Sequence, residues 1–469
     1  MNFGIALPVT IFCIWLALFS RIQVALLVVA FSSLIGTYVL NEDLGRSLLP
    51  GPIVATAFIA RYLFRRLVRV EPGVGQFPGR VWLVSLFSYA ALITLTVPWL
   101  MGGAIEVVRP GLLSEGFRFA VPLDFSISNI AQLAYLAVAT GLVFVAVHAT
   151  KIDGMFSEGY SRKLVTISCW IGVVIIVDLG LNLILGRVDI FGFLMGEVLG
   201  EYRPDRYALE GIFGFPLRRA QGVFGEPSYF SAFMSGTAAA SFIYMRSTRK
   251  IKDKLIFLII FSSLLLSFST TAYISAAIVL IVVAFAPMTR RDRVSRGGRG
   301  VAFLSVLLLS ALVVGLLVSS QTLSSYVFGK FSDTDGFESG NFSSGAERLY
   351  WDVTALRAFF ESWGLGVGVG SIRASSAFIN VAATMGLFGA SLFLVIIALV
   401  LRRIFGREEV ELSVGKQAVA AMLFGWLVAF SISVPDIISF FYFSIGLGVF
   451  LGAGFSEKRR LDIPVATSP

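Results

Sequence analysis

The sequence RRAQGVFGEPSYFSAF, residues 218–233, joins a polar loop to a hydrophobic segment. Pro227 suits the first position of a helix, because its fixed φ is helical and its missing N–H group would have no partner there anyway. A helix that begins at Pro227 points its unpaired N–H groups and the positive end of its dipole back toward the loop. With Arg218 and Arg219 in that loop, the stretch predicts a site for an anion such as phosphate.

The composition around this stretch is that of a membrane protein. Of 469 residues, 57% are hydrophobic and 14% are charged, and the mean hydropathy is +0.85. A soluble domain cannot bury so much apolar surface, so we expect an all-α polytopic integral membrane protein. Residues 1–18 are read as a retained first span and not as a signal peptide. The two cysteines, Cys13 and Cys169, lie in hydrophobic stretches, so no disulfide and no metal site is expected.

The hydrophobic segments predict about thirteen transmembrane helices. The expected spans are residues 3–20, 23–40, 50–64, 81–101, 128–150, 164–186, 227–245, 255–269, 272–288, 301–320, 377–401, 416–434 and 437–454. The run 255–288 is too long for one span and is expected to form a hairpin of two short helices that turns at residues 267–271.

Lysine and arginine predict the orientation of these spans. If the strongly basic connections lie inside, roughly 26 of the 38 basic residues but only roughly 10 of the 29 acidic residues face the inner side. This distribution places the N-terminus outside and the C-terminus inside. It also accounts for the net charge of +9 without nucleic acid as a partner.

Two long segments remain on the outer side, residues 187–226 and 321–376. Loops of this length are usually functional or disordered, and the aromatic residues in both argue against disorder. The chain is therefore divided into an N-terminal group of helices, a first outer loop, a central group of helices, a second outer loop and a C-terminal group with an inner tail. Their bounds are 1–186, 187–226, 227–320, 321–376 and 377–469.

The second outer loop predicts an amphipathic helix over Glu347–Trp363, followed by a glycine-rich turn, residues 364–371. Apolar residues recur along this helix at three- and four-residue spacing, and we expect the helix to lie at the membrane surface. The apolar residues are Leu349, Val353, Leu356, Phe360 and Trp363. The glycines of the turn allow a tight backbone path or a close approach to a ligand. A phosphate cradle is one interpretation of this turn, and a simple change of direction before a helix is the other.

The arginines of the outer loops are the strongest chemical signal, because the positive-inside bias disfavours them there. They are Arg218, Arg219, Arg348, Arg357 and Arg373. Guanidinium groups suit phosphate geometry, although each of these side chains can instead be solvated or paired with an acidic neighbour. Glu226 has two interpretations, a cap for the helix at Pro227 and a general base. His148, the only histidine, lies at the inner end of a span, so an outer site based on histidine is excluded.

The motif from Arg219 to Ser228, RAQGVFGEPS, resembles the motif before a central span in the O-antigen ligase/polymerase superfamily. The second loop supports the resemblance. Its arginine-bearing stretch RLYW, residues 348–351, precedes the glycine turn GLGVGVGS, residues 364–371, and then TMGLFG, residues 384–389. The resemblance covers about residues 210–400.

The resemblance implies a GT-C-like membrane glycosyltransferase of the bacterial inner membrane, with its active site on the periplasmic face. Such enzymes take the donor glycan from undecaprenyl diphosphate, without nucleotide sugar, cofactor or required metal. Ligases of the superfamily carry a histidine in the second loop, where this chain has Ser375 and Ser376. That difference favours the Wzy-type polymerases of O-antigen or exopolysaccharide, which commonly work beside a flippase and a chain-length regulator.

The polymerase hypothesis, motivated by the arginines of the outer loops beside hydrophobic spans, assigns roles to residues of both loops. Arg219 and Arg348 are expected to bind the diphosphate and to offset charge on the leaving group, and Glu226 to orient or deprotonate the acceptor. Further substrate contacts are expected from Arg218, Arg357, Arg373, Tyr229, Trp351, Gly368 and Gly370. Two rival functions remain, a ligase that transfers glycan to a lipid or protein acceptor and a transporter or flippase of lipid-linked glycan.

Overall fold

The described part of the chain is a bundle of helices with two short strand pairs. The computed structural model describes residues 6–34, 50–69, 76–109, 120–153, 156–185, 208–209, 217–218, 220, 222–224, 226–248, 250–285, 344–405, 413–434 and 440–453. The α-helices in these ranges are α1 Ala6–Phe19, α2 Ile22–Ser32, α3 Pro50–Arg69, α4 Arg80–Leu100, α5 Ile127–Ile152, α6 Phe156–Leu185, α8 Pro227–Thr248, α9 Ile251–Leu265, α10 Thr270–Phe285, α14 Ser344–Glu361, α15 Ala377–Phe405, α16 Val414–Ser433 and α17 Phe441–Ala453.

Among the described residues, five helices are long and apolar enough to cross a membrane, namely α4, α5, α6, α15 and α16. Shorter apolar helices lie within α1, α2, α10 and α17. The described chain is mostly helical, and its long apolar helices are compatible with an all-α membrane protein, whereas thirteen spans are not shown. The expected span 301–320 lies outside the described residues. The predicted hairpin is present, because α9 ends at Leu265 and α10 begins at Thr270.

Helix α8 lies inside the bundle and packs against α6, α9, α10 and α16. Its residues 230–244 are all buried, and many of them are alanine, serine or glycine. Small residues let the backbones of membrane helices approach closely. Gly236 shows why one is needed, since a Cβ atom there would lie 2.7 Å from the carbonyl oxygen of Met422 on α16. The indole of Trp426 fills the adjacent space, and its Nε1 donates to the carbonyl of Phe233 at 3.2 Å.

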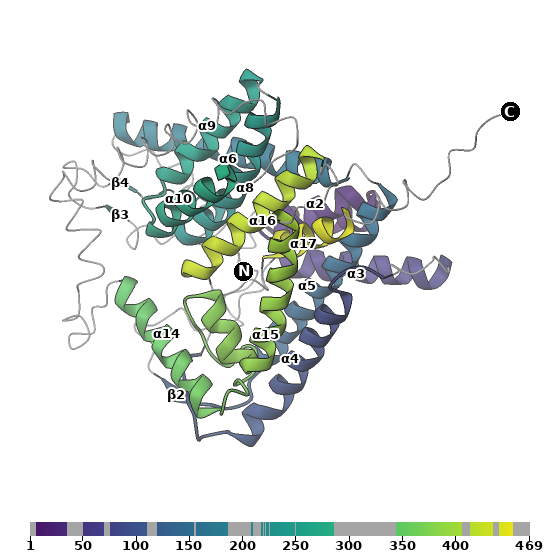
Figure 1. Cartoon of the computed structure of the whole chain (residues 1–469), viewed down its shortest axis with the longest axis vertical. Coiled ribbons are helices and arrows are strands. Elements are labelled where there is room, and N and C mark those ends of the chain that lie inside the picture. The colour runs from purple at the N-terminus through teal and green to yellow at the C-terminus, as the bar shows by residue number, and fades with distance from the viewer. Residues whose placement is uncertain are drawn as a thin grey trace.

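Helices α16 and α17 connect the two sides of the bundle (Figure 1). Helix α16 contacts α6, α8 and α10 on one side, and α17 contacts α2 and α5 on the other. The crossing of α17 with α5 again uses a small residue. A Cβ atom at Gly452 would lie 3.0 Å from the carbonyl oxygen of Val147. The centre of the bundle is thus fixed by close helix crossings and not by buried charge.

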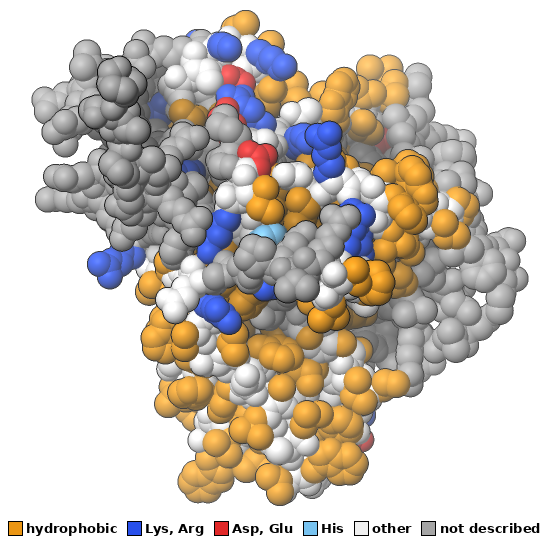
Figure 2. Space-filling view, turned by 90° about the vertical axis from the view of Figure 1, so that its right-hand side faces the viewer, with side chains coloured by type: hydrophobic (Ala, Val, Ile, Leu, Met, Phe, Trp, Pro, Cys, Tyr) orange, Lys and Arg blue, Asp and Glu red, His pale blue; other side chains and the backbone are white. Residues whose placement is uncertain are grey.

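One end of the bundle collects basic residues and is called the basic end here. Lys151, at the end of α5, donates to the carbonyl of Gln76 just before α4, at 3.1 Å. The guanidinium of Arg162, near the start of α6, lies 4.1 Å from the ring centre of Tyr244 near the end of α8. On the face in Figure 2, most Lys and Arg side chains lie in the upper part, and hydrophobic side chains cover most of the lower part. This arrangement matches the expected segregation of basic residues along a membrane protein.

The opposite end is built around the glycine turn, residues 364–371, and is called the glycine-turn end. The starts of α5 and α15 meet the ends of α4 and α16 here. Nδ2 of Asn129 donates to the carbonyl of Val369 at 2.9 Å, and the N–H of Val369 donates to Oγ1 of Thr94 at 2.9 Å. Oγ of Ser376 donates to the carbonyl of Ser431 at 2.8 Å. These bonds tie Val369 and Ser376 to three separate helices.

The structure also contains short antiparallel strand pairs, which the all-α expectation did not include. Strand β1 (Glu106–Val107) pairs with β2 (Val121–Pro122), and β3 (Ala208–Leu209) pairs with β4 (Leu217–Arg218). The first pair lies between α4 and α5 and packs against α14. The connection from α4 to α5 therefore contributes to the glycine-turn end.

Candidate functional site

Glu226 and Pro227 form the start of α8, as the sequence predicts. Pro227 is the first residue of the helix, and the N–H of Phe230 donates to the carbonyl of Glu226 at 3.2 Å. The hydroxyl of Ser228 donates to Oε2 of Glu226 at 3.1 Å. The side chain of Glu226 is only partly buried. It therefore occupies the favourable place for an acid at a helix start and still reaches the surface.

Tyr229 links this helix start to the end of α16. Its ring lies 5.3 Å from the ring of Phe440, edge to face, and Phe440 stacks on Phe430 at 5.7 Å. Phe430 belongs to the last turn of α16, next to Ser431, which accepts the bond from Ser376. A continuous chain of contacts thus joins the start of α8 to the start of α15. Glu226 and Tyr229 therefore lie at the glycine-turn end with the second half of the predicted site.

Helix α14 packs through small side chains and turns its large apolar side chains outward. Ala355, Ala358 and Ser362 are buried, and the two alanines contact a small cluster with Val107 and Val367. The outward apolar residues are Leu349, Val353, Leu356, Phe360 and Trp363, with Trp363 88% exposed. The predicted amphipathic helix is present, and its apolar face is not covered by the described part of the chain. This is the arrangement expected of a helix that lies on a membrane surface.

Trp351, on α14, forms a cation–π pair with Arg373. The Arg373 guanidinium carbon lies 4.0 Å from the ring centre of Trp351. The backbone N–H of Arg373 donates to the carbonyl of Val108 at 2.7 Å. Nε1 of Trp351 is buried and has no hydrogen-bond partner within the described ranges. An unpaired buried donor costs about 1–3 kcal/mol, so an acceptor on a bound molecule would relieve that cost.

Asp352 holds the chain between the glycine turn and α15. Its Oδ1 accepts the N–H of Ser375 at 2.6 Å and the N–H of Ser376 at 3.3 Å. Burial raises the pKa of the Asp352 carboxyl, while these two bonds and the nearby charge of Arg348 act in the opposite direction. Arg348 and Arg373 therefore interact with adjacent residues of α14, Arg348 with Asp352 and Arg373 with Trp351.

Arg357 has a different environment from the other arginines of this loop. Its Nε donates to Oε1 of Glu361 at 2.8 Å, and its side chain is 65% exposed. The bond to Glu361 raises the pKa of Arg357. Arg357 thus forms a solvent-exposed ion pair within one helix, which is the plainer of the two interpretations of the sequence. Such pairs contribute little to stability.

The glycine turn uses its N–H groups within the protein. Gly366 donates to Oγ of Ser362 at 3.1 Å, and Gly368 donates to the carbonyl of Thr384 at 2.9 Å. Gly370 is buried, and a Cβ atom there would lie 2.6 Å from the carbonyl oxygen of Ser128. Both Gly368 and Gly370 have positive φ, at 90° and 84°. In this conformation the turn fits between helices, and the prediction that Gly368 and Gly370 contact substrate stays a prediction.

The first outer loop is described only in short pieces. Arg218 ends strand β4, and Arg219 lies outside the described residues. The expected roles of both arginines therefore remain predictions. In the described ranges, no group of three or more His, Cys, Asp or Glu side chains is placed to hold a metal ion.

The sequence did not predict that strands β1 and β2 support the site. Ile105 and Val107 are buried on either side of the exposed Glu106, and Val108 accepts the N–H of Arg373. The alternation of apolar and polar residues at 105–107 was the available signal, but it is too short to distinguish a strand from a turn. Comparison of the chain with protein-family models and with curated proteins gave no match.

Proposed function

We propose that this protein is a membrane glycosyltransferase that joins repeat units of a polysaccharide, with undecaprenyl diphosphate as the leaving group. The observation that carries the proposal is the gathering of Arg348, Arg373 and Trp351 at the same end of the bundle as Glu226. Two guanidinium groups beside apolar helices suit a diphosphate whose lipid chain stays in the membrane.

In the proposed reaction, a hydroxyl oxygen of the acceptor glycan attacks the anomeric carbon of the donor glycan. A carbon–oxygen bond forms there, and the bond from that carbon to the diphosphate oxygen breaks, leaving its electron pair on the diphosphate. Glu226 takes the hydroxyl proton, since it is a partly exposed carboxylate at the start of α8. Arg348 offsets the charge that develops on the diphosphate, and Arg219 is assigned the same task from the first loop.

The remaining residues of the site position the substrate in this proposal. The Arg373 guanidinium lies over the Trp351 ring, so it is preorganised for an anion. The buried indole N–H of Trp351 supplies a donor for a phosphate or sugar oxygen. Arg357 is left out, because its side chain is exposed and already paired with Glu361.

Location and orientation follow from the same proposal. The glycine-turn end faces the periplasm, the basic end faces the cytoplasm, and the protein lies in a bacterial inner membrane. The outward apolar face of α14 supports a site at the level of the membrane surface.

Reconstitution of the purified protein into vesicles with an undecaprenyl-diphosphate-linked repeat unit tests the proposal. The expected product is a ladder of glycan lengths on a gel, without added metal or nucleotide. Arg219→Ala and Arg348→Ala are each expected to abolish the ladder, and Arg357→Ala, the matched control on α14, is expected to keep it.

Two results would overturn the polymerase assignment. Transfer of glycan to an added lipid A–core acceptor, without a ladder, would identify a ligase. A ladder of normal length from Arg219→Ala or Arg348→Ala would remove that arginine from the reaction.

A further inference from the structure

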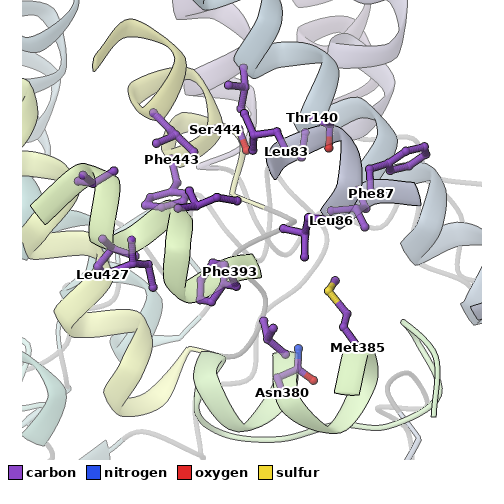
Figure 3. Close-up of a pocket in the computed structure, with 18 of the residues that line it drawn as sticks. Leu83, Leu86, Phe87, Thr140, Asn380, Met385, Phe393, Leu427, Phe443 and Ser444 are labelled. Carbon is purple, nitrogen blue, oxygen red and sulfur yellow. The ribbon is translucent and has the colours of Figure 1, made fainter. Parts of the chain in front are cut away.

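A mainly apolar cavity lies inside the bundle between α4, α5, α15 and α17, with α16 at one edge (Figure 3). Its walls include Leu86 and Phe87 from α4, Phe393 from α15, Leu427 from α16 and Phe443 from α17. The cavity volume is about 90 Å³. One water molecule needs about 10–15 Å³, so the space is large enough for a chain of several carbon atoms.

The walls of the cavity favour hydrocarbon over water. An apolar cavity of this kind stays dry, because a water molecule in it would lack two or more polar partners. In the membrane the neighbouring solvent is lipid, and α4 and α15 expose large apolar residues beside the cavity. Val84 and Leu394 are 45% and 52% exposed, and each directly follows a residue that lines the cavity. Hydrocarbon is therefore available at the outer surface of the same two helices.

Two of the four polar residues in the lining lie together on α15. Asn380 and Thr384 lie on the first turns of α15, and Oγ1 of Thr384 donates to the carbonyl of Asn380 at 2.6 Å. The N–H of Asn380 donates to the carbonyl of Ser376 at 2.9 Å. Ser376 is one of the two residues held by Asp352. The polar part of the cavity thus lies one helical turn from Ser376, which Asp352 of α14 holds.

In the opposite part of the lining, Thr140 and Ser444 carry hydroxyl groups and the other residues are apolar. Val400 lies five helical turns further along α15 than Asn380, and Leu83 lies at the start of α4, next to the basic end. A molecule that fills the cavity must therefore be mainly apolar, and Asn380 offers its polar group the one side-chain amide of the lining. A lipid chain with its headgroup toward the glycine-turn end has this polarity.

We propose that the cavity binds one hydrocarbon chain of a membrane lipid, with the headgroup at Asn380. The chain can belong to a phospholipid or to a polyprenyl diphosphate, since both present the same apolar surface to these walls. The cavity carries the inference by itself; only the identification of the chain as that of the glycan donor rests on the proposed function.

Native mass spectrometry of the detergent-purified protein tests this inference. The protein is incubated with a phospholipid of one defined acyl composition and with undecaprenyl diphosphate, separately and together. Ala139→Phe places a ring in the cavity, and Ala137→Phe makes the same change at an exposed position of α5. Ile397→Trp and Leu394→Trp form a second pair on α15, with only Ile397 in the lining.

The wild-type protein and the two exposed variants are expected to retain one lipid mass, and the two cavity variants are expected to lose it. Retention of phospholipid identifies a structural lipid, and retention of undecaprenyl diphosphate identifies a substrate chain. Equal retention by all five proteins, or no retained lipid in the wild-type protein, would overturn the inference. Failure of Arg348→Ala to stop polymer growth would instead contradict the proposed reaction, because Arg348 does not line the cavity.

Discussion

Asp352 is the residue that holds the second half of the candidate site together. One carboxylate oxygen accepts two backbone N–H groups from Ser375 and Ser376, at the point where the chain leaves the glycine turn. The neighbouring Trp351 holds Arg373, and Arg348 lies one turn before Asp352 on the same helix. The Asp352 side chain therefore links α14 to the start of α15, beside the residues that contact the two arginines.

Two replacements of Asp352 are expected to distinguish the effect of its hydrogen-bond acceptor from the effect of its charge on stability. Asp352→Ala leaves two partly buried N–H groups unpaired, at a cost of about 1–3 kcal/mol for each. Asp352→Asn keeps a carbonyl oxygen at the acceptor position and is expected to lose less stability. Thermal unfolding of the purified variants measures the difference. Equal losses from Ala and Asn would show that the two backbone bonds are not what Asp352 contributes.

The pH dependence of stability is a second consequence of the environment of Asp352. Burial raises its pKa in the folded protein above the unfolded value, so the folded state binds the proton more tightly. The contribution of Asp352 to stability is then fully present below the unfolded pKa and is lost as pH rises through the folded pKa. Relative to Asp352→Asn, the wild-type melting temperature is expected to fall as pH rises through that range. A difference that is constant with pH would contradict this assignment.

Among the elements, α14 shows how much of the site the sequence can and cannot predict. Its residue spacing predicts a helix over 347–363, and the observed helix is Ser344–Glu361. The spacing identifies an apolar face but not the direction in which that face points. The structure turns it outward and buries Ala355 and Ala358 instead. The periodicity of the sequence identifies the large apolar residues of the helix. The residues that pack against neighbouring elements are the small ones, because they allow a close approach.

The glycine turn shows a second limit of the sequence. Four glycines in seven residues predict a turn, and all four have positive φ. The partners of the turn come from distant parts of the chain, such as Thr94 on α4 and Ala383 on α15. Local sequence carries no information on such contacts. A glycine turn that packs within the protein and one that binds a ligand therefore have the same kind of local sequence. Only the arrangement of the helices distinguishes the two roles.

Substitution of Gly386 tests how closely this turn packs against α15. Its φ of 66° lies in the left-handed region and interrupts the helix, and a Cβ atom there would overlap the carbonyl oxygen of Leu365. Gly386→Ala is expected to lower the free energy of unfolding by about 1–2 kcal/mol through backbone strain. The steric overlap lowers it further. Gly103→Ala carries the strain alone, because its φ is 79° and no atom lies within 4 Å of the added methyl group. The melting temperature of Gly386→Ala should therefore be lower than that of Gly103→Ala. The reverse order would contradict the close packing of the glycine turn against α15.

At the scale of the whole molecule, the basic residues and the candidate site lie at opposite ends of the bundle. Basic residues gather where α5 ends and α6 begins, and the candidate site gathers where α8 and α15 begin. The sequence predicts this alternation from charge alone, because each crossing of a membrane reverses the end at which the next loop lies. It does not predict that contacts through Tyr229, Phe440 and Ser431 join the two outer segments. Such a path depends on which helices pack together.

Labelling of single cysteines from one side of the membrane tests both the two ends and the proposed orientation. In a Cys13→Ala, Cys169→Ala background, Arg357→Cys places a thiol at the glycine-turn end, and Lys250→Cys places one between α8 and α9 at the basic end. Both positions are exposed. A membrane-impermeant maleimide added to cells with a permeable outer membrane is expected to label Arg357→Cys at once, and Lys250→Cys only after the inner membrane is opened. The opposite pattern would reverse the orientation and move the site to the cytoplasm. Labelling of both thiols before the inner membrane is opened would mean that the bundle does not place its two ends on opposite sides.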